Sequence, residues 1–356
     1  MKQFLRLALV AATLSLGIFS CTDSERVNTD SAVGPTLGVE KKNPPPPGNS
    51  NPAFAFEDNY QVNGHRSVPA IFVMDVTGEN KTKVYSNYAS QWTENPDYPA
   101  WSGDGTKICF TVNQTDLYTL SISLINGYPV GSNPVKIGDG AAGGGNYRQG
   151  KWRPGANQIA CVWKRTGDPD KIHSIPSTGG SPSILYTSAS TDWTIEDDIA
   201  FRSDGSRLVF SERQLSTGDV FLNVLDVSTG DVIKTTDMSQ FKSIAGVDWA
   251  KSLGSDVVAI ETVPFCDTPI IGHNGFHEIY TIDVGSSTPS LTLLITNRGG
   301  ISWSPTDDRI TISSGVLLSC FLCCTAYYDG IGIFTLATQS ITYPSYTGGN
   351  HYDWKR

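Results

Sequence analysis

An aromatic residue recurs along this 356-residue chain at intervals of about 50 residues, each time followed by a turn and a short apolar run. The clearest copy spans residues 99–110, in which Trp101 is the aromatic residue and Gly103-Asp104-Gly105 forms the turn. The six aromatic anchors are Trp101, Trp152, Phe201, Trp249, Trp303 and Trp354. This repeat indicates a fold in which one structural unit is used six times.

Each repeat predicts a strand that ends at the anchor, a tight turn and a second strand. Two further short strands follow, as at residues 70–75 and 82–85. Four antiparallel strands per period are typical of a β-propeller blade. The 35 glycines and 20 prolines supply many turns and disfavour long helices. We therefore predict an all-β fold, a six-bladed β-propeller of four-stranded antiparallel blades.

The two ends of the repeat array complement each other. Residues 52–56 match the second strand of a blade, and a proline-rich segment precedes them. Residues 351–356 match a first strand, at the end of the chain. We predict that the C-terminal strand completes the first blade and closes the ring, which leaves no strand edge open. The propeller is predicted to occupy residues 51–356.

The pattern Pro-x-Trp-Ser-x-Asp-Gly-x-x-Ile-x-Phe at residues 99–110 resembles the repeat of the TolB-type, WD-repeat-like six-bladed β-propellers. The resemblance covers nearly all of residues 51–356, although the turns at residues 250–252 and 306–308 depart from the consensus. It implies a non-enzymatic binding module of the cell envelope more often than a catalyst. Because fold alone does not assign function, enzymatic activity stays open, with a non-catalytic role favoured.

The first 20 residues have the pattern of a secretory signal peptide. Lys2 and Arg6 accompany an apolar run at residues 7–19 that is too short to span a bilayer. The segment ends in Ile-Phe-Ser-Cys at Cys21, which resembles the bacterial lipobox. This resemblance implies that Cys21 becomes the acylated N-terminus of a lipoprotein, carrying fatty acyl chains such as palmitate. The alternative is an ordinary secreted protein in which Cys21 has no such role.

Residues 21–50 have the composition of a flexible tether. They are mostly polar and contain four consecutive prolines at residues 44–47. Such a segment has little to bury and is expected to stay solvated. The sequence thus predicts a lipid-anchored protein of the bacterial cell envelope at the outer membrane, on the periplasmic or the surface face.

The charge balance excludes one class of partner. Lys and Arg number 26 against 35 Asp and Glu, which gives a formal net charge of −9. No basic patch for nucleic acid or for an anionic membrane surface is visible. Contact with the membrane is therefore predicted through the N-terminal lipid only.

The connections between strands divide into short, regular turns on one face of the ring and variable loops on the other. Long connections are predicted at residues 57–69, 263–277 and 315–330, all on the second face. Because long loops that are not repeated are often functional, we place the binding surface on this loop face.

Acidic and aromatic residues are predicted to line the rim of that face. The candidate binding residues are Trp92, Glu94, Tyr98, Tyr147, Trp193, Asp197 and Tyr352, with Asp97, Glu196, Asp198, Asp248, Tyr346 and Asp353 continuing the set. Such a rim suits a basic peptide, a stacked sugar or a cation. The alternative is that these residues pack between blades. We predict a protein or peptide partner and a monomeric chain, with glycan binding or cleavage as the second hypothesis.

The cysteines other than Cys21 fall into two groups. Cys109 and Cys161 lie in predicted second strands and are expected to be small buried apolar residues. The candidate disulfide set in the long connections is Cys266, Cys320, Cys323 and Cys324, whose pairing the sequence leaves open.

Motifs for catalysis and cofactors are missing from the sequence. It contains no Gly-x-Ser-x-Gly elbow, phosphate-binding loop or His-Glu-x-x-His motif. His65, His273, His277 and His351 could gather near the loop cysteines, but their spacing matches no zinc motif, so no metal is predicted. His173 occupies a third-strand position and is predicted to be structural. No cofactor is predicted.

Overall fold

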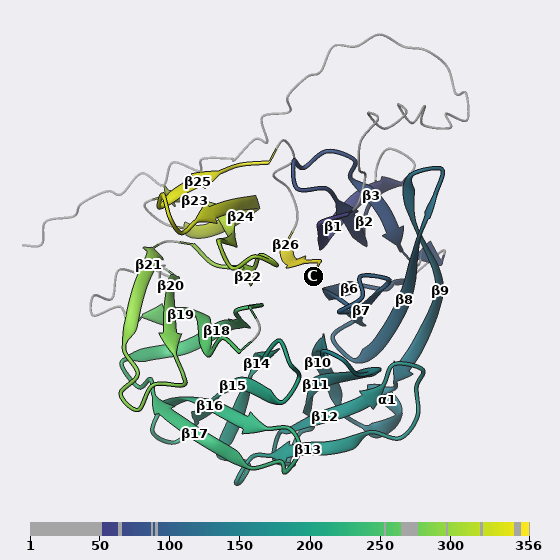
Figure 1. Ribbon diagram of the computed structural model, residues 1–356. Coiled ribbons are helices and arrows are strands. Elements are labelled where there is room, and N and C mark those ends of the chain that lie inside the picture. The colour runs from purple at the N-terminus through teal and green to yellow at the C-terminus, as the bar shows by residue number, and fades with distance from the viewer. Residues whose placement is uncertain are drawn as a thin grey trace, which may run out of the picture. The chain divides into compact units, whose positions relative to one another are not determined.

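Six four-stranded antiparallel sheets follow one another around a ring in the residues that the structure describes (Figure 1). The structure is a computed structural model. Its described residues are 52–62, 66–86, 88–89, 92–252, 254–264, 277–296, 298–320, 323–344 and 350–355. They lie within Pro45–Arg356, which the contacts between residues separate from Met1–Pro44.

The first three blades follow in chain order, each named from its innermost strand outward. Blade 1 contains β26 (Asn350–Trp354), β1 (Phe54–Val62), β2 (Arg66–Met74) and β3 (Thr82–Tyr85). Blade 2 contains β6 (Pro96–Trp101), β7 (Lys107–Val112), β8 (Asp116–Ile125) and β9 (Tyr128–Gly138). Blade 3 contains β10 (Asn146–Trp152), β11 (Gln158–Lys164), β12 (Lys171–Pro176) and β13 (Ser183–Thr187).

The other three blades have the same strand order. Blade 4 contains β14 (Trp193–Phe201), β15 (Arg207–Gln214), β16 (Val220–Asp226) and β17 (Val232–Asp237). Blade 5 contains β18 (Phe241–Trp249), β19 (Val257–Pro264), β20 (Glu278–Asp283) and β21 (Leu291–Thr296). Blade 6 contains β22 (Ser302–Trp303), β23 (Arg309–Cys320), β24 (Cys323–Thr335) and β25 (Ser340–Thr342).

Three short elements lie between blades. The strands β4 (Tyr88–Ala89) and β5 (Trp92–Thr93) pair in the connection from blade 1 to blade 2. The short helix α1 (Gly140–Gly143) precedes blade 3, and the Asp139 side chain caps it by accepting a hydrogen bond from the Ala142 N–H. Within the described residues, no helix has the length and apolar character needed to cross a membrane.

The fold class and the closure of the ring are confirmed. The C-terminal strand β26 pairs antiparallel with β1, so that Phe54 lies opposite Trp354. The two rings are 4.5 Å apart between centroids, and the Lys355 N–H donates to the Ala53 carbonyl at 2.7 Å. The N-terminal and C-terminal parts of the propeller thus complete one blade together (Figure 1).

The six anchors behave as the repeat predicts. Each ends the innermost strand of its blade and is at most 6% exposed. The buried apolar residues that the structure describes form six clusters, and each cluster joins two neighbouring blades. Phe54 and Met74 of blade 1, for example, pack with Ile331 and Ile333 of blade 6. The core therefore lies between blades, and each blade depends on both of its neighbours.

The prediction of a long loop is wrong at two of the three positions. Residues 57–69 mostly belong to the β1–β2 hairpin, whose pairing continues to Val62 opposite Arg66. Residues 315–330 belong mostly to the β23–β24 hairpin, whose pairing continues to Cys320 opposite Cys323. In both places the strands of the blade continue their pairing into the connection, so the backbone is paired where a loop was predicted. The third predicted loop includes residues 265–276, which lie outside the described residues.

Candidate functional site

The innermost strands carry polar side chains that connect one blade to the next. Asp248, which precedes the anchor Trp249, accepts a hydrogen bond from the backbone N–H of Trp303, the next anchor, at 2.7 Å. Ser302 accepts one in the same way from the Trp354 N–H at 3.3 Å. The residue before an anchor therefore binds the following blade at these boundaries.

Two further carboxylates extend this arrangement. Asp353 accepts from the Trp101 N–H at 2.8 Å, and thereby joins blade 1 to blade 2. Asp198 accepts from the Val247 N–H at 3.0 Å, and thereby joins blade 4 to blade 5. A carboxylate that accepts a backbone N–H at a blade boundary satisfies a buried donor and fixes the spacing of the blades.

Two lysines complete this inner cluster, which we define as Lys151, Asp198, Asp248, Lys251 and Asp353. Lys151 Nζ lies 3.6 Å from Asp198 Oδ1, and Lys251 Nζ lies 2.6 Å from Asp248 Oδ1. The two positive and three negative charges leave a net charge of −1. Such pairing offsets most of the cost of burying charged groups.

The electrostatics of the inner cluster differ from one carboxylate to another. Burial raises the pKa of Asp353 and of Asp198, against the opposing effect of Lys151. Burial would also raise the pKa of Asp248, but the Lys251 and Lys151 ammonium groups outweigh it and the pKa is lowered. Desolvation therefore determines the pKa shift of Asp353, whereas the nearby lysine determines that of Asp248.

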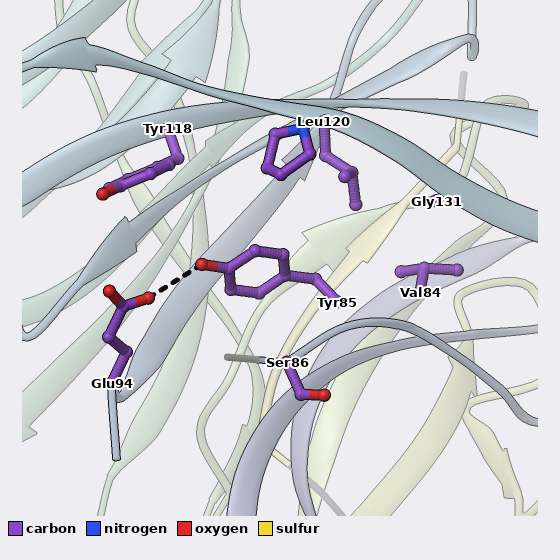
Figure 2. A pocket seen from close by; sticks show the side chains of 8 residues that line it. Val84, Tyr85, Ser86, Glu94, Tyr118, Leu120 and Gly131 are labelled. Atoms are coloured by element: carbon purple, nitrogen blue, oxygen red, sulfur yellow. Dashed lines mark hydrogen bonds between the residues drawn. The ribbon is translucent and has the colours of Figure 1, made fainter. Parts of the chain in front are cut away.

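A cleft between blades 1 and 2 is the second candidate site (Figure 2). Its volume is about 390 Å³, near the lower end of the range for ligand pockets. The lining residues are Val84, Tyr85, Ser86, Glu94, Tyr118, Leu120, Gly131 and Pro134. They come from the end of β3, from the connection that follows β3, and from β8 and β9.

The cleft has a polar end and an apolar end. The Tyr85 hydroxyl donates to Glu94 Oε2 at 2.9 Å, and Figure 2 shows Tyr118 on the same side as this pair. Val84 and Leu120 lie toward the other end of the Tyr85 ring (Figure 2). The two tyrosine rings also contact Phe110, at 4.6 Å from Tyr85 and 5.8 Å from Tyr118 between centroids.

The tyrosines of the cleft stay protonated at neutral pH. Burial raises the pKa of Tyr85, and the hydrogen bond to Glu94 raises it further. Burial also raises the pKa of Tyr118, with Glu94 as the next cause. Glu94 is therefore the one charged residue among the eight that line the cleft.

Close approach of two strands forms one wall of the cleft. A Cβ atom at Gly131 of β9 would lie 2.1 Å from the Val84 carbonyl oxygen of β3, so only glycine fits there. The hairpin that carries Gly131 turns at Asn126 and Gly127, which both have positive φ, at 53° and 82°. These values are typical of the two-residue turns that Asn-Gly favours.

The predicted rim residues have different surroundings in the structure. Glu94 lines the cleft, whereas Trp193 packs on Phe221 at 5.6 Å between centroids. Tyr98 is half-buried within β6 and has a φ of +53° at a bulge in the pairing with β7. Glu196 pairs with Arg213 at 3.0 Å.

Tyr147 and Tyr352 are packing residues rather than rim residues. Tyr147 is 5% exposed and lies 4.7 Å from the Trp163 ring, and Tyr352 is 7% exposed and stacks on Phe56. Both belong to innermost strands; the sequence predicted a strand at Tyr352 but a connection at Tyr147, where pairing begins earlier than expected. Asp97 is also buried, and the side chains of Trp92 and Asp197 and all of Tyr346 lie outside the described residues.

The cysteine and histidine predictions are tested in part. Cys109 and Cys161 are fully buried free thiols, as predicted. Cys266 lies outside the described residues, as do the side chains of Cys320, Cys323 and Cys324, so the disulfide set stays a prediction. His173 is buried against Trp163, with rings 5.5 Å apart, which confirms its structural position.

The histidines considered for a metal are described only in part. His65 and His273 and the side chain of His351 lie outside the described residues, and the His277 side chain contacts Glu261. In the part of the chain that is described, no group of three or more His, Cys, Asp or Glu side chains is placed to hold a metal ion.

Comparison with known proteins places the fold. No protein-family model matches the chain, and no curated protein matches it. Among solved structures, TolB from Acinetobacter baumannii is similar, with a TM-score of 0.54 and 14% identity over 86% of this chain and 67% of that chain. A protein described as TolB from Agrobacterium tumefaciens has a TM-score of 0.51 and 14% identity over 85% of this chain and 92% of that chain.

A protein described as a synthase is also among the structural neighbours. Hydrazine synthase from Kuenenia stuttgartiensis has a TM-score of 0.50 and 12% identity over 78% of this chain and 89% of that chain. This chain is a six-bladed β-propeller with TolB structural neighbours. At such low identity the likeness establishes the fold alone, so function has to be argued from the site.

Sequence reasoning found one residue of the cleft, Glu94, and missed the others. Tyr85 ends a predicted fourth strand, and its aromatic ring was a usable signal. Gly131 and Pro134 interrupt a long fourth strand in blade 2, which marks a close approach or an irregular edge. What the sequence does not contain is the contact between that strand and β3 of the neighbouring blade.

Proposed function

We propose that this chain is a lipid-anchored β-propeller of the bacterial cell envelope that binds a protein or peptide partner without catalysis. The observation that carries the proposal is the cleft between blades 1 and 2, where aromatic rings and one carboxylate line a space of about 390 Å³. A small cleft with an aromatic lining and few polar groups has the composition of a recognition site.

The roles of the buried carboxylates support a binding module over a catalyst. Asp198, Asp248 and Asp353 each accept a backbone N–H from the neighbouring blade. Their lone pairs hold the ring together, so these groups have a structural task that does not depend on a substrate. This favours the non-catalytic hypothesis over glycan cleavage by an acid–base pair, which needs two available carboxyl groups.

The N-terminal sequence supports the proposed location. The segment that ends at Cys21 resembles a lipobox, and residues 21–50 have a tether composition. Each buried methylene of an acyl chain contributes roughly 0.8 kcal/mol to membrane binding, so two or more chains give durable anchoring. We place the propeller at the outer membrane, where the tether lets it reach a partner.

Site-specific photo-crosslinking in intact cells tests the function. A photoreactive amino acid is placed singly at exposed positions: Pro134 in the lining of the cleft, and Leu215 and Ile233 on blade 4. The proposal expects one protein to form an adduct from position 134 and not from the two positions on blade 4. It is overturned if no position forms a protein adduct and the purified chain instead binds sugars saturably on a glycan array, which supports the second hypothesis.

A further inference from the structure

We infer that the cleft between blades 1 and 2 binds a single cationic side chain, of the arginine or lysine type, presented by a partner polypeptide. The inference deepens the proposed function and rests on it for the source of that side chain. The recognition itself depends only on the charge and shape of the cleft.

The charge of the cleft favours a cation. Glu94 carries the one formal charge among the lining residues, and the two tyrosines keep their protons because burial and Glu94 raise each pKa. The connection at residues 86–95 contains no lysine or arginine. Glu94 would repel an anion here, whereas a guanidinium or ammonium group gains an ion pair with it.

Lys136, a cation on the strand beside Tyr118, has acidic partners of its own. Lys136 of β9 lies opposite Tyr118 in the strand pairing. Its Nζ atom contacts Asp116 Oδ2 at 3.0 Å and Asp139 Oδ2 at 3.1 Å. These two carboxylates compensate the charge of Lys136.

The shape of the cleft fits a long side chain with a charged head. Val84 and Leu120 can cover an aliphatic stem, while Glu94 and the Tyr118 ring lie at the polar end (Figure 2). Lysine and arginine place apolar stems along apolar surface in this way. A cation near a tyrosine ring also gains a cation–π interaction, and the ring of Tyr85 is held in place by its hydrogen bond to Glu94.

Ligand-observed NMR on the detergent-solubilised full chain tests the inference directly. The probe is N-acetyl-arginine amide, and its neutral analogue N-acetyl-citrulline amide serves as the reference. The wild-type chain is expected to bind the arginine probe at least about fivefold more tightly than the citrulline probe at low salt, because only the arginine probe carries the charge.

Glu94→Gln is the decisive variant, since glutamine keeps an oxygen that can accept from the Tyr85 hydroxyl but removes the charge. It is expected to weaken binding of the arginine probe by about five- to tenfold. Glu79→Gln makes the same charge change at an exposed residue of blade 1 outside the cleft lining, and should leave binding unchanged. Tyr118→Leu provides a second variant, which should also weaken binding through loss of the ring.

Two results would overturn the inference. One is equal binding of the arginine probe by the wild-type and Glu94→Gln chains, and the other is binding of a neutral disaccharide such as maltose in the absence of arginine binding. The crosslinking experiment separates this failure from failure of the proposed function. If Glu94→Gln still yields the same protein adduct from position 134, the chain binds a partner but not through a cation at Glu94.

Discussion

The side chain of Asp353 accepts a hydrogen bond from the backbone N–H of Trp101 at 2.8 Å, although 252 positions of sequence separate the two residues. Asp353 belongs to the strand that completes blade 1, and Trp101 is the anchor of blade 2. The C-terminal strand therefore does more than pair with β1. It also fixes the boundary between the first two blades, and the cleft lies between the same two blades.

Removal of residues 350–356 is expected to destabilise the propeller strongly. The truncation exposes the surface that Tyr352 and Trp354 bury, which contributes about 2 kcal/mol for each side chain. It also leaves the Trp101 N–H without its acceptor and opens the edge of β1. Urea denaturation should show a free energy of unfolding that is lower by several kcal/mol, or a chain that no longer folds.

The matched control is a chain that ends at Lys355, because it retains all of β26 and the Lys355–Ala53 hydrogen bond. This control should unfold like the full chain. A truncation at residue 349 with the same midpoint as the control would show that ring closure adds nothing to stability.

The sequence predicted the architecture because the propeller repeats its own signals. Trp354 is recognisable as an anchor only because five similar anchors precede it at regular intervals. The extents of the β1–β2 and β23–β24 hairpins were not predictable in this way, because they depart from the repeat. Periodicity reports what the blades share and carries no information on what distinguishes one blade from another.

The candidate sites depend on contacts between blades, which a linear pattern does not contain. Asp248 and Asp353 were predicted as rim residues from their type, yet both accept backbone N–H groups of the next anchor. The same limitation applies to the cleft, since Gly131 and Val84 are distant in sequence and meet only because two blades pack together. Residue type alone does not distinguish a buried structural carboxylate from an exposed functional one.

Asp353 and Asp248 are expected to affect the pH dependence of stability in opposite directions. Burial raises the pKa of Asp353 in the folded chain. As the pH rises above about 4, the unfolded chain therefore loses the Asp353 proton before the folded chain does. Wild-type protein should therefore lose stability relative to Asp353→Asn as the pH rises from there. Urea denaturation between pH 3.5 and 7 measures this difference.

Asp248→Asn is the matched comparison for that series. The lysines beside Asp248 lower its pKa, so its contribution to stability is present above about pH 4 and is lost as the pH falls below. Wild-type protein should lose stability relative to Asp248→Asn as the pH falls through this range. Difference curves with the same slope for both variants would contradict the assignment of opposite environments.

Cys21→Ala is expected to move the protein from the membrane fraction to the soluble fraction. The lipobox resemblance implies that Cys21 carries the acyl chains in the function we propose, and without them the predicted tether has no apolar anchor. Cell fractionation followed by immunoblotting measures the change. Asn28→Ala in the same tether should stay with the membrane, and an unchanged distribution of Cys21→Ala would refute lipid anchoring through this residue.

Gly131→Ala is expected to destabilise the boundary between blades 1 and 2. The new Cβ would lie 2.1 Å from the Val84 carbonyl oxygen and 2.9 Å from Leu120 Cδ2, so the strands have to separate, at a cost of about 1–3 kcal/mol. Gly103→Ala is the control, because no atom lies within 4 Å of the position that its new Cβ would take. Equal thermal unfolding midpoints for the two variants would show that β9 and β3 are farther apart than the structure has them.

His173 is expected to make the propeller sensitive to mild acid. Burial lowers the pKa of His173 to about 4, with a smaller effect of Lys171, so the folded chain keeps this imidazole neutral where the unfolded chain is protonated. Stability is therefore present above about pH 6.5 and falls as the pH approaches 4, by on the order of 3 kcal/mol for this one group. His173→Phe keeps a ring against Trp163 and removes the titration. Denaturation at pH 7.5 and 4.5 should show a larger loss for the wild-type chain than for His173→Phe, and equal losses would mean that His173 is accessible to protons in the folded state.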